Sequence, residues 1–317
     1  MDVGVFFPME PAGRAPGDDY RSTLELIRDC ESLGYNSVWI ASRHLSSMYA
    51  SVPSPIVLLA AAAAITERLV LGTSIISLPL QDALQVAEDF AVLDAISKGR
   101  GRLGVGSGDD PPAFEAMGVA FDERQGVLSD KLREVIRLLE GGPVGASGLR
   151  IHPAVEGPLN KVALGAQSAR GAAWAGSLGI GLLQGRSEPK AKDPTVSQAR
   201  AAEAYREVHP QGRVTTARNV WIGSVADERF SQALRRYDSY LRSRGRDPLP
   251  NDPVAAAQKM NVLFGRTAQD VAEQAVAMVG PIKPDELLVT VDPGGLDDPS
   301  RKERLVELAS ALGLGAS

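Results

Sequence analysis

The residues best suited to chemistry stand just after short apolar runs of the chain. Ser42, Arg43 and His44 follow the run Ser37–Ile40, at the point where a strand would end. Imidazole has an ordinary pKa close to neutrality, so His44 suits a polar contact to a ligand or a proton transfer. A solvent-facing loop histidine explains the same residue equally well. The other two histidines each precede a proline in loop-like sequence and are given no role.

A turn over residues 165–171 has the composition of an anion site. It reads Gly-Ala-Gln-Ser-Ala-Arg-Gly, with an apolar run before it and a helical pattern after it. The first backbone N–H groups of a helix have no intrahelical partner, and the helix dipole is positive there. A phosphate would be held by those amides, by the Ser168 hydroxyl and by Arg170. Ser168 acting only as the helix cap is the alternative, and the turn by itself favours it.

A third segment, Gly106-Ser107-Gly108, would let a ligand approach the backbone closely. This signal is weak alone, because Gly-Ser-Gly is common in turns. The sequence has no metal-ligand spacing of His, Cys and carboxylates and no serine nucleophile elbow. It also has no Walker loop, and no dinucleotide fingerprint follows its first strand.

Two kinds of segment must position these residues, and they alternate along the chain. The predicted strands are Asp2–Phe6, Ser37–Ile40, Leu69–Ser74, Arg102–Val105, Lys161–Leu164, Ile180–Leu183, Ala217–Ile222 and Glu286–Val291. The predicted helices lie near Tyr20–Leu33, Pro55–Ile65, Ala83–Ala95, Asp130–Leu139, Arg170–Leu178, Ser197–Val208, Glu228–Arg242, Ala268–Val279 and Arg301–Leu312. Strands that alternate with helices pair in parallel through right-handed crossovers.

The pattern therefore predicts an α/β fold, a (β/α)8 TIM barrel with residues 1–317 as a single domain, because eight such units close readily. An open, doubly wound sheet is the alternative. Residues after barrel strands line the C-terminal mouth, which favours a phosphate at residues 165–171. Gly34 and Gly99 stand where a glycine in the left-handed conformation would end a helix. Thr267 can cap the helix that starts near Ala268. The loop at residues 185–196 is a candidate lid or, equally well, a plain connection.

Composition excludes several classes of function. The chain has 317 residues and a formal net charge of −5, so it lacks the basic surface that nucleic-acid binding needs. Its longest apolar run, Ile56–Ile65, is about half the length needed to span a bilayer. The start MDVGVFFP lacks the regions of a signal peptide. The single cysteine, Cys30, fits a buried thiol in a reducing compartment. We expect a cytoplasmic protein without a membrane or nucleic-acid partner.

Several stretches resemble the bacterial-luciferase-like family of flavin-dependent monooxygenases. They are GYNSVWIASRH (34–44), LVLGTSIISLP (69–79), AEDFAVLDAISKGRGRLGVGSG (87–108), FEAMGVAFDER (114–124), ALGAQSARGAAWAGSLGIG (163–181) and GRTAQDVAEQ (265–274). They span most of the chain in the family's order, and the combination is far more specific than any single piece. The strongest local signal is Ser-Lys-Gly-Arg after Leu-Asp.

The resemblance implies a barrel that binds reduced FMN or, as the alternative, the deazaflavin coenzyme F-420 across its mouth. The phosphate would meet Gln167, Ser168 and the amide of Gly171. The family's third strand often ends in a non-prolyl cis peptide beneath the flavin ring, which here would be the Ser74–Ile75 bond. Phe6 would form part of an apolar wall.

The sequence departs from the family pattern at three places. Luciferases proper carry Glu-His-His where this chain has Ser42, Arg43 and His44. The histidine central to luciferase chemistry aligns with Arg43, so Arg43 and His44 are the candidate catalytic residues. An arginine that helps to bind the FMN phosphate aligns with Ser107, and Arg170 or Arg186 would replace it. The long insertion after the seventh strand is shortened, so light emission is not predicted.

Three functions follow from this resemblance. The first is a monooxygenase that uses reduced FMN and O2 on a small organic substrate, with a separate flavin reductase as partner. The second is a dehydrogenase or reductase that depends on coenzyme F-420. The third is a non-catalytic flavin-binding subunit, which the missing Glu-His pair favours. Relatives in the family are often dimers, so a homodimer is expected.

Overall fold

Eight parallel strands close into a barrel. The computed structural model describes residues 1–9, 15–46, 52–185, 194–224, 226–243, 245–260, 262–291 and 298–315. The barrel strands are β1 (Asp2–Phe7), β2 (Ser37–Ile40), β3 (Val70–Thr73), β5 (Gly101–Gly106), β6 (Val162–Gly165), β7 (Gly181–Gln184), β8 (Val214–Ile222) and β10 (Glu286–Val291). They pair in chain order, and β10 pairs with both β1 and β8. This second pairing closes the cylinder and excludes the open sheet.

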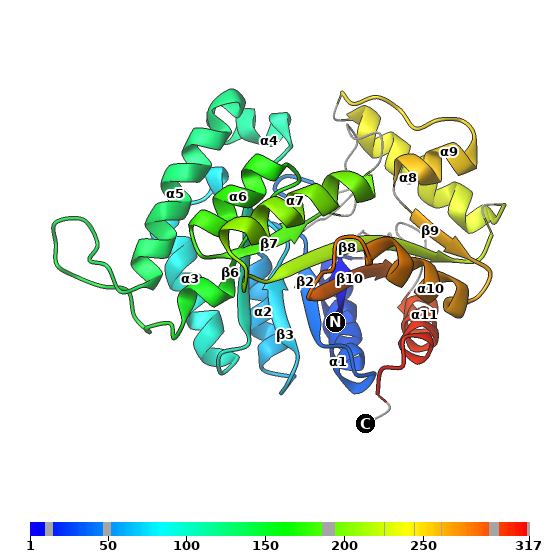
Figure 1. Ribbon diagram of the computed structural model, residues 1–317, viewed down its shortest axis with the longest axis horizontal. Helices are drawn as coiled ribbons and strands as arrows, with labels where there is room; N and C mark the ends of the chain where they lie inside the picture. The colour runs from blue at the N-terminus through cyan, green and yellow to red at the C-terminus, as the bar shows by residue number, and fades with distance from the viewer. Residues whose placement is uncertain are drawn as a thin grey trace.

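Helices surround the strands (Figure 1). Those that connect barrel strands or follow the last one are α1 (Pro16–Ser32), α2 (Pro55–Ala63), α3 (Ala83–Ile96), α5 (Arg124–Leu139), α6 (Ala169–Ser177), α7 (Pro194–Val208), α10 (Ala268–Val279) and α11 (Asp298–Ala311). Their apolar faces and the outward faces of the strands form one large buried cluster. The predicted (β/α)8 fold class is confirmed, whereas the extent of the domain over residues 1–317 stays a prediction.

Helix ends follow the predicted chemistry. Gly34 and Gly99 both have a φ of +88°, the left-handed conformation that glycine adopts without strain. Thr267 accepts a hydrogen bond from the backbone of Asp270, and the Asp270 side chain accepts one in return, so a capping box starts α10. By contrast, α7 begins at residue 194, inside the stretch that we interpreted as a loop. The remainder of the candidate lid, residues 186–193, lies outside the described residues.

The connection between β8 and α10 contains elements that the sequence pattern did not reveal in full. It carries α8 (Glu228–Ser243), α9 (Pro253–Lys259) and β9 (Val262–Gly265), and β9 extends the sheet by pairing with β8. Their apolar side chains form a cluster separate from the main core. In Figure 1 this group lies at the upper right, away from α3, α5 and α6 on the left. A short strand, β4 (Ile76–Ser77), was also not predicted.

Candidate functional site

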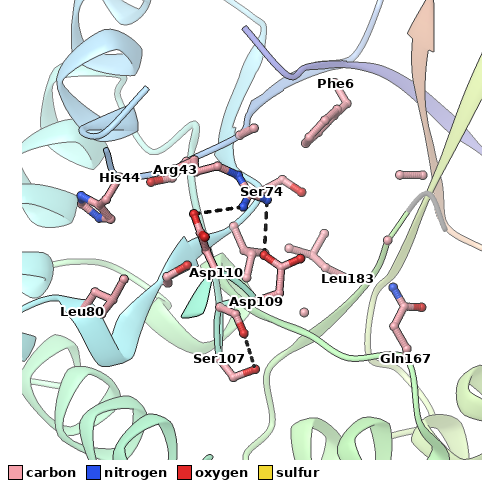
Figure 2. Close-up of a pocket in the computed structure, with 18 of the residues that line it drawn as sticks. Phe6, Arg43, His44, Ser74, Leu80, Ser107, Asp109, Asp110, Gln167 and Leu183 are labelled. Atoms are coloured by element: carbon pink, nitrogen blue, oxygen red, sulfur yellow. Dashed lines mark hydrogen bonds and ion pairs between the residues drawn. The ribbon is translucent and has the colours of Figure 1, made fainter. Parts of the chain in front are cut away.

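A cavity of about 400 Å³ opens at the C-terminal ends of the barrel strands. Its walls come from the residues that follow β1, β2, β3, β5, β6 and β7 (Figure 2). Seven predicted site residues line it: Phe6, Arg43, His44, Ser74, Ile75, Ser107 and Gln167. The remaining four, Gly106, Ser168, Arg170 and Gly171, are not among its lining residues. The roles assigned to all eleven stay predictions.

The peptide bond between Ser74 and Ile75 is cis, as the resemblance implied. Glycines on two neighbouring strands make room for the Ile75 side chain. A Cβ atom on Gly106 would lie 2.2 Å from Cδ1 of Ile75, and one on Gly165 would lie 3.2 Å from its Cγ2. The glycine at position 106 is therefore explained by the packing of Ile75. Direct approach of a ligand to its backbone is not required.

The start of α6 is a capped helix terminus. Ser168 is exposed, and its Oγ accepts a hydrogen bond from the backbone N–H of Gly171 at 3.2 Å. Arg170 is also exposed. The cap that we gave as the alternative interpretation of Ser168 is therefore present, and a phosphate would have to share these groups. Arg186, the other proposed replacement for the missing arginine, lies outside the described residues.

Two carboxylates and an aromatic ring surround the guanidinium of Arg43. Its Nη2 lies 3.3 Å from Oδ1 of Asp109, and its Nη1 lies 3.4 Å from Oδ2 of Asp110. Its Cζ lies 5.2 Å from the ring centroid of Tyr240 on α8. Only 15% of the Arg43 side chain and 7% of the Asp110 side chain are exposed. This packing suits a residue that positions others, because arginine stays protonated and does not shuttle protons.

Arg246, beyond the end of α8, links the β8–β9 connection to the cavity. Its Nη2 lies 3.0 Å from Oδ2 of Asp109 and also donates to the Asp109 backbone carbonyl. Loss of solvent would raise the pKa of Asp109, but the guanidiniums of Arg43 and Arg246 outweigh it and hold that pKa below its ordinary value. Sequence reasoning missed this cluster, because its members are far apart in the chain.

His44 lies on the side of the cavity near Leu80, across from Gln167 (Figure 2). Its Nε2 is 2.7 Å from the side-chain nitrogen of Gln81. Burial lowers the pKa of His44, because the charged imidazole is less well solvated there. Sequence reasoning assigned no role to Gln81, since a glutamine next to a proline-containing turn carries no motif.

Two polar atoms in this region are buried and have no hydrogen-bond partner among the described residues. They are Oε1 of Gln167 and Oγ of Ser42, both from residues that line the cavity. Buried polar groups in native proteins are nearly always paired, so such exceptions require an explanation. A ligand that donates hydrogen bonds would provide it.

The structure also bears on metal binding and on membrane insertion. Within the described residues, no group of three or more His, Cys, Asp and Glu side chains is placed to hold a metal ion. In that part of the chain, no helix has both the length and the apolar character that crossing a membrane requires.

Known proteins resemble this chain in both sequence and structure. It is 33% identical over 142 residues to 4-hydroxyprotoasukamycin monooxygenase of Streptomyces nodosus subsp. asukaensis, which covers 44% of this chain and 38% of that protein. It is 35% identical over 116 residues to F420-dependent glucose-6-phosphate dehydrogenase of Kineococcus radiotolerans, which covers 35% of this chain and 33% of that protein. The chain thus aligns with less than half the length of either relative.

Agreement in fold extends over almost the whole chain. The crystal structure of monooxygenase RslO1 from Streptomyces bottropensis superposes with a TM-score of 0.83 at 22% identity, covering 98% of both chains. The model of the luciferase-like monooxygenase family matches residues 1–292. This match covers most of the sequence, and the chain therefore belongs to the luciferase-like monooxygenase family.

Proposed function

We propose that this protein is a flavin-dependent monooxygenase that uses reduced FMN and O2 to oxidise a small organic substrate. The observation that carries the proposal is the cavity at the barrel mouth, with buried polar atoms of Gln167 and Ser42 that lack partners in the described chain. Pockets that bind cofactors are mostly apolar, with a few convergent polar groups. Membership of the family and the similarity to a monooxygenase over part of the chain support the same reaction.

The residues present fit a flavin. Phe6, Ile75 and Leu183 supply apolar walls, which suit a flat ring system. The unpartnered Oε1 of Gln167 would accept a hydrogen bond from a hydroxyl or N–H group of the cofactor. The α6 terminus, with Ser168, Arg170 and the amide of Gly171, would hold the phosphate. When bound, reduced FMN would supply the electrons that activate O2.

The protein's own contribution is binding, orientation and exclusion of water. The apolar walls keep solvent from the reacting atoms, and His44 would contact an oxygen atom of the substrate. Arg43 would keep the loops after β2 and β5 together through Asp109 and Asp110.

Charge at the mouth favours an uncharged substrate. Arg43 and Arg246 carry two positive charges, Asp109 and Asp110 carry two negative ones, and the four groups pair with one another. An ionic substrate would have to break one of these pairs, at a cost in desolvation. The hydroxyl, amide and imidazole groups of the lining remain available to form hydrogen bonds with a neutral substrate.

The test is to titrate the protein with FMN and to obtain the Kd from the change in fluorescence. Replacing Ser168 and Arg170 together with alanine should raise the Kd at least about tenfold, since hydrogen bonds to a charged group contribute roughly 1.5–3 kcal/mol. Ser177→Ala is the matched control, because this exposed serine at the other end of α6 bonds only its own helix, at Trp174. Unchanged FMN affinity in the double variant would refute the phosphate assignment.

The second candidate function is a dehydrogenase or reductase that uses coenzyme F-420. Ser107 in place of the arginine that binds the FMN phosphate favours it, as does the partial similarity to an F420-dependent dehydrogenase. Parallel titrations with FMN and F-420, followed by oxygen-consumption measurements with reduced FMN, separate the two. Tight F-420 binding without oxygen uptake would replace the first proposal by the second.

Partners and compartment extend the proposal. A separate reductase would supply reduced FMN. A homodimer is supported by exposed apolar side chains on the adjacent helices α2 and α3, namely Val57, Val92 and Ile96, and by the exposed Ile65 in the turn that follows α2. Cytoplasmic location is supported by Cys30, which is buried and forms no disulfide among the described residues. A free thiol is typical of a reducing compartment. Sedimentation analysis would test the dimer.

A further inference from the structure

We propose that Gln81 is a positioning residue that holds His44 in the Nδ1–H tautomer, so that His44 offers the cavity a hydrogen-bond donor. The side-chain nitrogen of Gln81 lies 2.7 Å from Nε2 of His44. A carboxamide nitrogen carries two hydrogens and can only donate. With the carboxamide in this orientation, Nε2 is the acceptor, and the single proton of the neutral ring sits on Nδ1.

The backbone of Gln81 is fixed from three sides. Its N–H donates to the carbonyl of Leu78 at 3.0 Å, which closes the 3-10 turn Leu78–Leu80. Its carbonyl accepts a hydrogen bond from Nζ of Lys131 on α5, which also donates to the carbonyl of Pro79 at 2.9 Å. The next residue, Asp82, caps α3 by accepting from the backbone of Gln85 at 2.9 Å. This anchoring holds the carboxamide against the imidazole.

The environment of His44 keeps the ring neutral. Desolvation is the cause of its lowered pKa. The charged groups around the pair are Lys131 and Asp82 on the Gln81 side, and Arg43, Asp109 and Asp110 in the cavity wall. None of them offsets the loss of solvent. Protonation of Nε2 would in addition remove the acceptor that Gln81 uses.

The remaining ring nitrogen decides what His44 can recognise. His44 lines the cavity, and Gln81 is its only hydrogen-bond partner within the described residues. A ligand that contacts Nδ1–H must offer an acceptor, such as a carbonyl or ether oxygen. The inference about the ligand rests on the proposed function. The tautomer of His44 is a property of the protein alone. It narrows the proposed substrate to a neutral molecule with an acceptor oxygen on the His44 side.

The experiment is NMR of the 15N-labelled protein without cofactor, read through the two-bond couplings of the imidazole rings. The chain has three histidines, so His152 and His209 are internal controls, and loss of one signal set in His44→Gln assigns His44. We expect wild-type His44 to show a protonated Nδ1 and an unprotonated Nε2. A wild-type His44 that carries its proton on Nε2 would overturn the proposal.

Variants of Gln81 test causation. Gln81→Glu places an acceptor against Nε2, so the proton should move to Nε2 and the pKa of His44 should rise. Gln81→Leu should give a mixture of both tautomers. Gln85→Leu is the matched control, because this exposed glutamine on α3 bonds only Asp89 through its side chain. Unchanged His152 and His209 signals establish that each variant folds. If both Gln81 variants keep the wild-type tautomer, Gln81 does not position His44.

Because this readout needs no flavin, its outcome is independent of the proposed reaction. A protein that binds neither FMN nor F-420 refutes the monooxygenase proposal and leaves the His44 tautomer measurable. A reversed tautomer refutes the role of Gln81 and leaves flavin binding intact.

Discussion

The two ends of the barrel use buried polar groups in opposite ways. At the base, Glu286 is buried, accepts hydrogen bonds from Ser37 and from Thr215 at 3.0 Å, and lies 3.7 Å from Arg213. At the mouth, Gln167 and Ser42 each keep a buried oxygen without a partner in the described chain. Satisfied polar groups stabilise a fold, whereas buried unsatisfied groups that line a cavity are candidates for contact with a ligand. The paired groups at the base stabilise the barrel, and the unpaired oxygens at the mouth remain available to a ligand.

The largest effect on stability should come from the base. Replacing Glu286 with alanine leaves the Ser37 and Thr215 hydroxyls without their acceptor and removes a buried charge that Arg213 faces. We expect a loss of about 3 kcal/mol in the free energy of unfolding, measured with urea. Glu286→Gln, which keeps an acceptor oxygen, should lose less. If a folded Glu286→Ala protein bound FMN more weakly, the base of the barrel would contribute to ligand binding, and the two ends would not differ as described.

The next largest effect should come from Arg43. Arg43→Ala leaves the buried carboxylate of Asp110 without this cation, and we expect to lose about 2 kcal/mol of unfolding free energy. Arg246→Ala is the comparison, because its partner Asp109 is 63% exposed and such pairs contribute under about 1 kcal/mol. Equal losses in the two variants would contradict the assignment of Arg43 as the anchor of the cluster.

A smaller effect concerns pH. Arg43 and Arg246 lower the pKa of folded Asp109, so this group stabilises the folded protein above its unfolded pKa of about 4. That stabilisation is lost as the pH falls through the folded pKa. In Arg246→Ala the pKa of Asp109 in the folded protein moves back up towards its ordinary value. Acidification should therefore remove less unfolding free energy from this variant than from the wild type. The difference between wild type and variant in urea midpoint should narrow on acidification, and a widening difference would reverse the sign of the coupling.

The smallest change in stability is expected at Gln167. Because its Oε1 has no partner within the described ranges, Gln167→Leu should change the unfolding free energy by less than about 0.5 kcal/mol. FMN affinity should nevertheless fall. A strongly destabilised Gln167→Leu protein would show that this oxygen is structural, as Glu286 is.

Much of the barrel was predictable, because parallel strands buried on both faces appear as short apolar runs between amphipathic ones. Gly34, Gly99 and Thr267 marked helix ends through local chemistry alone. The strand β9 was missed because its four residues carry too little pattern, and it is defined by pairing with β8.

The candidate site was predictable only in part. His44 and Gln167 were found from their place after a strand, since a barrel brings all such positions to one mouth. The partners of these residues were not found. Arg246 meets Asp109 across 137 positions of sequence and Gln81 meets His44 across 37, and no local pattern encodes contacts of that kind.

The cluster formed by α8, α9 and β9 packs around its own apolar centre, including Trp221 and Phe230, rather than into the main core. It reaches the cavity through Tyr240 and Arg246. Part of the cavity's surroundings is therefore held by a core separate from that of the barrel. Substitutions in this segment would therefore act on the cavity indirectly, through Arg43 and Asp109, and leave the barrel strands unchanged.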